Sequence, residues 1–110
     1  DKLEETFDKV LPEKFHVNIS KKDKLENVIY YHFDNFYLLV NFNISNQFST
    51  ALYLKWPHVA LLGYNNLKCD SEIEKNLSNL FTMAAQRASE KRYKNKADLI
   101  LKLSAYASVA

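Results

Sequence analysis

The chain of 110 residues is 47% hydrophobic and 14% aromatic, and its formal net charge is +2. That length fits one domain, residues 1–110, and the apolar content is that of a globular protein rather than a disordered one. The small net charge does not by itself favour nucleic acid or an anionic membrane as a partner. No stretch approaches the roughly 18 apolar residues of a membrane span, and no signal peptide is visible.

Compartment and processing signals are few. The one cysteine, Cys69, permits no internal disulfide and favours a reducing, intracellular compartment, nuclear or cytoplasmic. Asn-x-Ser triplets begin at Asn18, Asn43 and Asn76, but a chain with eleven asparagines forms such triplets by chance. The chain begins at Asp1 without a methionine, which indicates a fragment or a processed product.

The chain opens with a predicted helix and a predicted strand. Apolar residues within 3–11 lie at helical spacing, which predicts a helix that ends before Pro12. Apolar and polar residues alternate over 15–19, which predicts a strand with one wet face. The charged run 21–24 predicts a turn.

The next segment predicts a β-hairpin with strands at 28–33 and 36–45. Asp34 and Asn35 would form its two-residue loop, because both residue types tolerate a left-handed backbone.

Two further strands complete the predicted sheet. Residues 46–49 predict a turn, and 51–56 predict a strand that stops before a proline. Residues 59–62 predict a short apolar strand that ends at Gly63, with a loop at 65–66.

The last third of the chain predicts helices. Ser71 and Glu74 form a capping-box pattern, and one apolar stripe then continues at helical spacing to a predicted end near Tyr93. The stripe consists of Ile73, Leu77, Leu80, Phe81, Ala84, Ala85 and Ala88. Residues 94–96 break the pattern, and 98–109 predict a last helix, although their leucines also alternate as in a strand.

The predicted strands come first and the main helices follow, and the connections between them are short. This order predicts an α+β fold. We expect an antiparallel β-meander of four to five strands, with an N-terminal helix and one or two C-terminal helices packed on one face.

The hairpin register assigns the side chains to two faces of the sheet, because directly opposed residues share a face. The core face carries Ile29, Tyr31, Phe33, Phe36, Leu38, Val40, Phe42 and Ile44. The second face carries Tyr30, His32, Tyr37, Leu39 and, from the next strand, Tyr53, with Asn41, Asn43 and Lys55 at its fringe. Tyrosine and histidine combine an apolar body with a polar tip, a composition typical of partner-binding surfaces.

Four interpretations of this second face are open. Residues 99–106 could fold back and cover it. A protein partner or a second copy could bind it, since a contiguous apolar patch is rarely left bare. Single-stranded RNA could stack its bases on the rings, or a small ligand could lie in a groove there.

A basic cluster closes the long predicted helix and consists of Arg87, Lys91, Arg92, Lys94 and Lys96. Contact with phosphate groups is one interpretation. The other is a solvated helix end, where cations offset the helix dipole and Glu90 supports Lys94.

The sequence predicts no catalytic residue, metal site or cofactor. His16, His32 and His58 lack the paired spacing of a zinc site. Cys69 precedes a helix start, where a thiolate is favoured, and with His58 or His32 it forms the one candidate nucleophile pair. A cysteine there is more often a small loop residue, and no acid/base pair of carboxylates stands out.

The order of these elements resembles that of the RWD family. A helix at 3–11, strands at 15–19 and 51–56 and a hairpin at 28–44 match its helix and four-stranded meander. Trp56-Pro57 stands roughly where that family often has a Tyr-Pro step, but the second proline of the usual motif is missing. The resemblance spans most of the chain. It implies a non-catalytic relative of the ubiquitin-conjugating fold that pairs with a like domain or docks peptides, including in kinetochore complexes.

The sequence therefore leads to one expected function and one alternative. The first is a non-catalytic protein–protein interaction domain, a subunit of a larger assembly, that binds a protein partner or a second copy through the second sheet face. The alternative is an RNA or single-stranded nucleic-acid binding module that uses the same aromatic face together with the basic cluster. A membrane partner is not expected.

Overall fold

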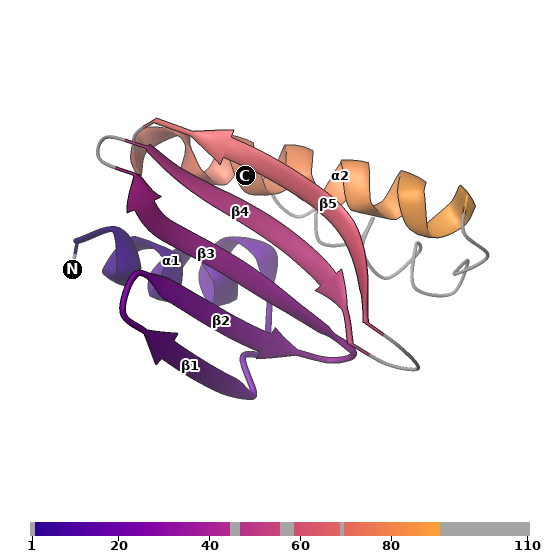
Figure 1. Cartoon of the computed structure of the whole chain (residues 1–110), viewed down its shortest axis with the longest axis horizontal. Helices are drawn as coiled ribbons and strands as arrows, with labels where there is room; N and C mark the ends of the chain where they lie inside the picture. Colours follow the sequence, from indigo (N-terminus) through magenta and orange to yellow (C-terminus); the bar gives the residue numbers. More distant parts are fainter. Residues whose placement is uncertain (1, 45–46, 56–58, 69, 91–110) are drawn as a thin grey trace.

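The structure is a computed structural model that describes residues 2–44, 47–55, 59–68 and 70–90. Helix α1 (Lys2–Phe15) precedes five strands, and a short 3-10 helix, η1 (Asp70–Glu72), leads into helix α2 (Ile73–Glu90) (Figure 1). The strands are β1 (Lys21–Leu25), β2 (Val28–Phe33), β3 (Phe36–Ile44), β4 (Gln47–Leu54) and β5 (Ala60–Leu67).

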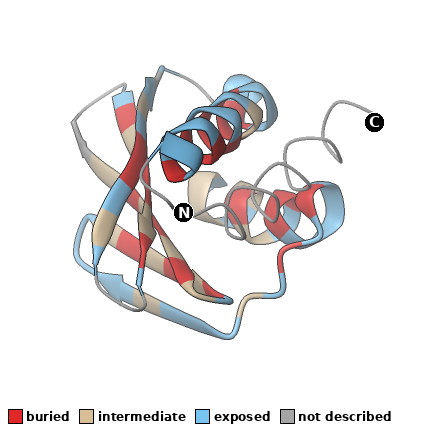
Figure 2. Ribbon diagram, turned by 90° about the vertical axis from the view of Figure 1, so that its right-hand side faces the viewer, coloured by how far each residue is buried: buried red, intermediate tan, exposed pale blue. Residues whose placement is uncertain are grey.

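The five strands form one antiparallel sheet whose spatial order is the chain order, β1-β2-β3-β4-β5. Both helices lie on the same side of this sheet, α1 behind β2 and β3 and α2 behind the β5 end (Figure 1). Figure 2 shows the sheet nearly edge-on, with both helices on one side of it. The predicted α+β class, a meander with helices on one face, is therefore confirmed.

The predicted hairpin has the predicted register. Phe33 pairs with Phe36 across a two-residue loop of Asp34 and Asn35. Asp34 has a φ of 49°, in the left-handed region that aspartate tolerates better than most residues. The backbone N–H of Lys55 donates to the Asn35 carbonyl at 2.7 Å, so the end of β4 is tied to this loop.

The hydrophobic core lies between the sheet and the two helices. Phe7 of α1 packs edge-on against Phe48 of β4, with ring centroids 5.7 Å apart, and Phe15 packs edge-on against Phe81 of α2 at 5.3 Å. Six residues of the predicted core face are at most 1% exposed: Ile29, Tyr31, Phe33, Phe36, Leu38 and Val40. Phe42 is partly buried against this core.

Helix α1 extends beyond its predicted end. It includes Pro12 and continues to Phe15, although a proline removes one N–H from the helical ladder. Phe15 is fully buried against Phe81, and this contact stabilises the turn that follows the proline. The strand predicted at 15–19 is absent, because Phe15 belongs to the helix and His16, with a φ of 56°, turns the chain out of it.

The charged residues 21–24 form strand β1 rather than the predicted turn. Every residue of β1 pairs with β2, from Lys21 opposite His32 to Leu25 opposite Val28. A run of charges is typical of a turn, but at a sheet edge it also prevents pairing with other chains. The acidic partners of Lys22 and Lys24 lie on α1, more than a dozen residues away in sequence.

Strands β4 and β5 are longer than predicted. β4 begins at Gln47, inside the expected turn at 46–49, and β5 continues through Gly63 and through the expected loop at 65–66. The pairing of β4 with β5 shifts at Leu62, where a β-bulge interrupts the regular register. The bulge breaks the alternation of side chains, which is the pattern by which a strand is recognised in a sequence.

Helix α2 carries the predicted apolar stripe, and all seven of its residues are buried. Asn76 is buried beside them, and the Thr50 hydroxyl of β4 donates to its Oδ1 at 3.0 Å. Because a buried amide requires hydrogen-bond partners, this pair fixes the position of α2 over β4. The predicted helix at 98–109 and the expected helix end near Tyr93 lie outside the described residues.

The single glycine of the chain lets α2 approach β5 closely. A Cβ atom on Gly63 would lie 3.1 Å from Leu80 Cδ1, 3.3 Å from the Leu80 carbonyl oxygen and 3.4 Å from Ala84 Cβ. One of these atoms belongs to the helix backbone, so a larger residue at position 63 would displace the helix rather than one side chain.

We therefore predict that Gly63→Val destabilises the fold by about 2 kcal/mol, because the added branches overpack the contact with Leu80. Urea unfolding followed by circular dichroism measures this change. The matched control is Leu61→Val, on the same strand but facing away from the helices, which we expect to change stability by less than about 0.5 kcal/mol. Equal losses in the two variants would show that the close approach of α2 does not govern stability.

Candidate functional site: the outer sheet face

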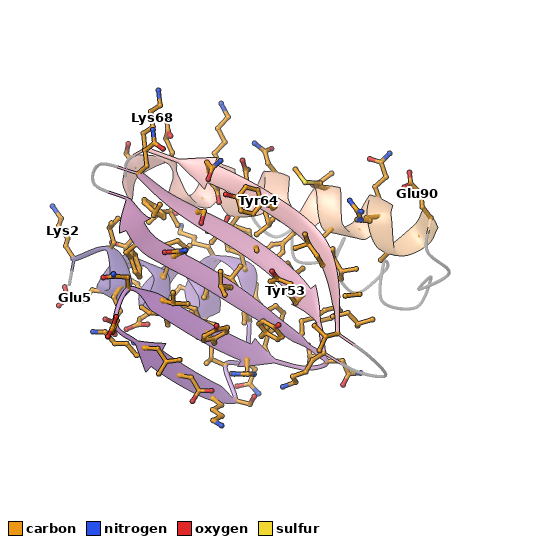
Figure 3. All side chains as sticks on the ribbon, viewed as in Figure 1. Lys2, Glu5, Tyr53, Tyr64, Lys68 and Glu90 are labelled. Carbon is orange, nitrogen blue, oxygen red and sulfur yellow. The ribbon has the colours of Figure 1, made fainter. Side chains whose placement is uncertain are left out.

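The five predicted partner-binding residues lie together on the sheet surface that faces away from the helices. Cross-strand pairing places them in two adjacent rows. The first row is His32, Tyr37, Tyr53 and Leu61, and the second is Tyr30, Leu39, Ala51 and Tyr64. We call these eight residues the outer face. Figure 3 shows Tyr53 and Tyr64 on this near surface of the sheet.

Aromatic rings contact one another along and between the rows. Tyr37 and Tyr53 are stacked, with centroids 4.9 Å apart and ring planes 13° from parallel. Tyr37 also lies 5.7 Å from the ring of Tyr30 and 5.7 Å from that of His32. Tyr37 is thus the centre of a four-ring cluster whose geometry falls in the range of favourable aromatic pairs.

The outer face is only partly open to solvent, because its side chains shield one another. Ala51 is 2% exposed although it belongs to this face, since it lies between the larger Leu39 and Tyr64 on the flanking strands. Exposure rises toward β5, to 43% for Leu61 and 51% for Tyr64.

The hydroxyl of Tyr37 resists ionisation. Burial raises the pKa of Tyr37 above its ordinary value of 10.0, and the neighbouring Tyr53 and Tyr30 raise it further, since ionised hydroxyls would repel one another. The Tyr37 hydroxyl therefore stays neutral at physiological pH and presents a hydrogen-bond donor without charge.

Charged groups border the outer face at the His32 end. His32 Nε2 lies 3.1 Å from Asp23 Oδ2, and the Lys55 ammonium lies 3.3 Å from His32 Nδ1. In the neutral tautomer with hydrogen on Nε2, the ring donates to Asp23 and accepts from Lys55. Lys21 lies 3.6 Å from Asp23, so this rim carries two lysines around one carboxylate.

Sequence reasoning missed the outer-face residues of β5 and the rim residues of β1. Tyr64 lies beyond the strand predicted at 59–62, and Leu61 lies within that strand but had no predicted partner that would assign it to a face. Lys21 and Asp23 were hidden because their segment predicts a turn. The aromatic Tyr64 close to a branched apolar run was the one available indication that the strand continues.

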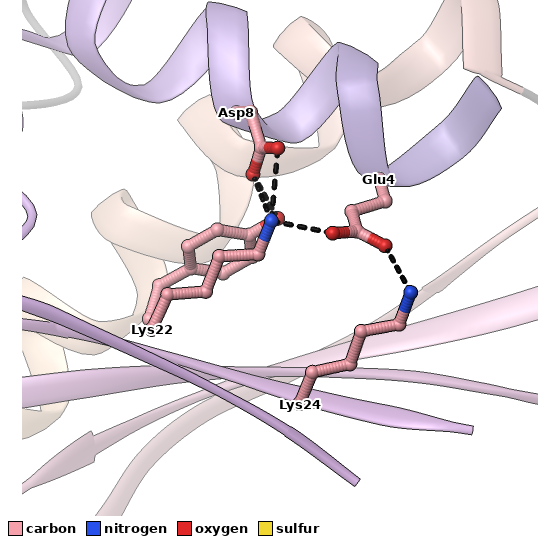
Figure 4. A network of polar contacts seen from close by, with 5 residues as sticks. Glu4, Asp8, Lys22 and Lys24 are labelled. Atoms are coloured by element: carbon pink, nitrogen blue, oxygen red, sulfur yellow. Dashed lines mark hydrogen bonds and ion pairs between the residues drawn. The ribbon is translucent and has the colours of Figure 1, made fainter. Parts of the chain in front are cut away.

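Strand β1 is held against α1 by a network of ion pairs (Figure 4). Lys22 contacts the carboxylates of Glu4 and Asp8, the latter at 2.9 Å, and Lys24 contacts Glu4 at 2.7 Å. The buried Tyr31 donates its hydroxyl to Asp8 at 2.8 Å. The network fixes the edge strand that carries Asp23 and so supports the rim of the outer face.

The same contacts shift three pKa values. Hydrogen bonds from Lys22 and Lys24 lower the pKa of Glu4 from 4.5 to about 2. Partial burial disfavours the Lys22 cation, but its hydrogen bonds to Glu4 and Asp8 outweigh this and raise the pKa of Lys22. Burial, and then the bond to Asp8, raises the pKa of Tyr31 far above its ordinary value.

Only one member of the basic cluster can be placed relative to the outer face. Arg87, the one member within the described residues, is exposed on α2, on the opposite side of the sheet (Figure 1). The remaining members, Lys91, Arg92, Lys94 and Lys96, lie outside the described residues, as do the possible covering segment 99–106 and the pair Cys69 and His58.

The candidate catalytic and metal-binding residues lie partly within the described chain. Both ring nitrogens of His32 are engaged by charged groups, and neither partner is a hydroxyl or thiol nucleophile. Within residues 2–44, 47–55, 59–68 and 70–90, no three His, Cys, Asp or Glu side chains gather as metal ligands. Asn76, the start of one Asn-x-Ser triplet, is 5% exposed, and this burial is incompatible with a glycan on the folded chain.

Comparison with known proteins gave no match to any family model, curated protein or solved structure. Among the helices of the described residues, none is long and apolar enough to cross a membrane.

We predict that Glu4→Gln destabilises the fold by about 1 kcal/mol at pH 6, because it removes the carboxylate that Lys22 and Lys24 share. The pKa of Glu4 is lowered by folding, so its contribution is complete above pH 4.5 and is lost as the pH falls toward 2. Urea unfolding of both proteins between pH 6 and pH 2 should therefore show their difference shrinking. The control is Glu5→Gln at an exposed neighbouring position. If the difference in unfolding free energy between the original chain and Glu4→Gln does not depend on pH, the lowered pKa of Glu4 is wrong.

Proposed function

We propose that this chain is a non-catalytic protein–protein interaction domain that acts as a subunit of a larger assembly and binds its partner through the outer face. One observation carries the proposal. Two adjacent rows of aromatic and apolar side chains cover a sheet surface on which neither described helix packs. A contiguous apolar patch of this kind marks an interaction surface more often than an accident of composition.

The arrangement of the rings suits a partner interface. Tyrosine provides a large rigid contact area, and its hydroxyl can form hydrogen bonds at an interface. Tyr30, Tyr37 and Tyr53 are already held by mutual ring contacts, so binding would cost them little additional conformational entropy. The rim of Lys21, Asp23 and Lys55 provides charges that orient a partner at the border of the contact.

The partner in this proposal is a second protein or a second copy of the chain. In the RWD-like interpretation of the sequence, such domains pair with a like domain, including in kinetochore complexes. The single cysteine supports an intracellular site of action, nuclear or cytoplasmic.

The proposal predicts that a photo-reactive phenylalanine analogue at position 53 forms defined protein adducts in extracts of the source cells, whereas the same analogue at Gln86 on α2 does not. Adding Tyr37→Glu should abolish the adducts at position 53, because it places a charge at the centre of the ring cluster. Denaturing electrophoresis detects the adducts, and thermal unfolding checks that the variants fold. Equal adducts at positions 53 and 86, or none at 53, would contradict the proposal.

The alternative is a module that binds single-stranded RNA or other single-stranded nucleic acid. The stacked rings of Tyr37 and Tyr53, with Lys55 beside the row, favour it, since bases stack on such rings and phosphates bind nearby cations. Arg87 lies on α2, on the other side of the sheet, so this member of the basic cluster would not contact a short strand bound to the aromatic face.

The alternative predicts that a twelve-nucleotide uridine oligomer binds at low salt with an affinity that falls steeply as salt rises. Lys55→Glu should weaken this binding at least about tenfold, because it reverses one charge next to the rings, whereas Arg87→Glu should leave it unchanged. Fluorescence anisotropy at 20–200 mM salt measures both effects. No binding at the lowest salt would exclude this function.

A further inference from the structure

The two edges of the sheet differ sharply in charge. Four of the five residues of β1 are charged, whereas the eight residues of β5, Ala60–Leu67, include no charged side chain. Charged side chains on an edge strand discourage pairing with another chain, and their absence permits it. β1 is therefore a protected edge, whereas no strand of the described residues pairs with the outer side of β5.

Exposed apolar side chains gather beside the uncharged edge. Five large hydrophobic side chains are exposed in the described part of the chain, and four of them lie on β5, next to it, or on the helix packed behind it. These four are Val59, Leu61, Tyr64 and Met83, each at least 43% exposed. The fifth, Leu25, lies at the end of β1.

The main chain of β5 specifies what can bind there. Its inner side pairs with β4 on both sides of the bulge at Leu62, while the backbone hydrogen bonds found between other described segments do not involve it. One outer group is capped locally, since the Asn66 N–H donates to Asn65 Oδ1 at 2.9 Å. The other outward N–H and C=O groups of β5 alternate along the strand. Another extended backbone presents the complementary alternation and can pair with them.

Helix α2 packs against β5, next to this edge. The close approach at Gly63 brings the helix to β5, which it contacts more extensively than β4. Between them lies a pocket of about 190 Å³ lined by Asn65, Asn66, Glu72, Lys75, Asn76 and Asn79. An edge strand beside a helix is the arrangement in which several domains bind extended peptides.

We propose that the β5 edge accepts an extended segment of a partner protein as a sixth strand, lying beside α2. The segment would be free of consecutive charges and would alternate apolar and polar residues, with one face toward Met83 and the other continuing the outer face beside Tyr64. This inference rests on the proposed function and deepens it, because it specifies how the partner's backbone is recognised.

A second copy of the chain fits this edge less well than a single extended segment. Antiparallel pairing of two β5 strands would bring two α2 helices to the same side of the joint. Strands pair at about 4.8 Å, whereas packed helices need about 8–10 Å. Because α2 lies mainly over β5, the two helices would compete for the same space.

The test is amide hydrogen exchange of the full chain, followed residue by residue by NMR. The probe is a synthetic peptide of alternating threonine and valine with a lysine at each end, added at millimolar concentration. We expect the outward amides of β5 to exchange rapidly in the free protein and at least tenfold more slowly with the peptide. The matched control peptide is N-methylated at alternate residues, which removes its pairing N–H groups without changing its side chains, and it should have no effect.

Three results would overturn the inference. Slow exchange of these amides in the free protein at every concentration would mean that the chain already pairs with its own edge. Protection that grows with protein concentration would make a second copy the occupant. Absence of peptide protection, or equal protection by the N-methylated peptide, would mean that β5 does not recognise an extended backbone.

A substitution on α2 separates this inference from the proposed function. Met83→Glu should weaken peptide binding at least fivefold while leaving the adducts at position 53 intact. Loss of those adducts on Tyr37→Glu without any peptide effect on β5 would refute the edge inference and leave the outer-face proposal standing. Peptide protection of β5 without adducts at position 53 would refute the outer-face proposal and leave the edge inference standing.

Discussion

Both helices of the described residues pack on the same face of the sheet, and most other described features of the molecule follow from this constraint. Side chains alternate along each strand, so five strands that bury one set of residues must present the other set on the opposite surface. In this chain the second set includes Tyr30, Tyr37, Leu39 and Tyr53. Their mutual stacking reduces the cost of contact with water, and a binding partner would reduce it further.

The two helices hold the sheet by different kinds of contact, and this difference determines the character of each edge. Helix α1 reaches β1 through the ion pairs of Lys22 and Lys24, so that edge is charged and closed to other chains. Helix α2 reaches β5 through the close approach at Gly63 and the buried bond between Thr50 and Asn76. These contacts involve no charged side chain. The side chains of β5 are accordingly uncharged, and exposed apolar side chains lie beside them.

Local patterns predicted the elements whose contacts are near in sequence. The Asp34-Asn35 loop determined the hairpin register, and the register determined which tyrosines face outward. Helical spacing likewise identified the buried stripe of α2. The errors arose where distant residues decide the conformation: β1 is a strand because its lysines meet acids on α1, and the turn after Pro12 is stabilised by Phe15 packing on Phe81. The bulge at Leu62 concealed the continuation of β5 to Tyr64, and no local pattern reveals a bulge.

We propose that the outer face is open in the isolated chain and covered in its assembly. Hydroxyl-radical footprinting, read by mass spectrometry, tests this most directly when the purified chain is compared with the chain in native complexes from the source cells. We predict that Tyr30, Tyr37 and Tyr53 are oxidised in the purified chain and at least fivefold less in the assembly, while the exposed Met83 changes only if the partner also occupies the β5 edge. Equal oxidation of the three tyrosines in both states, or protection already present in the purified chain, would contradict the account.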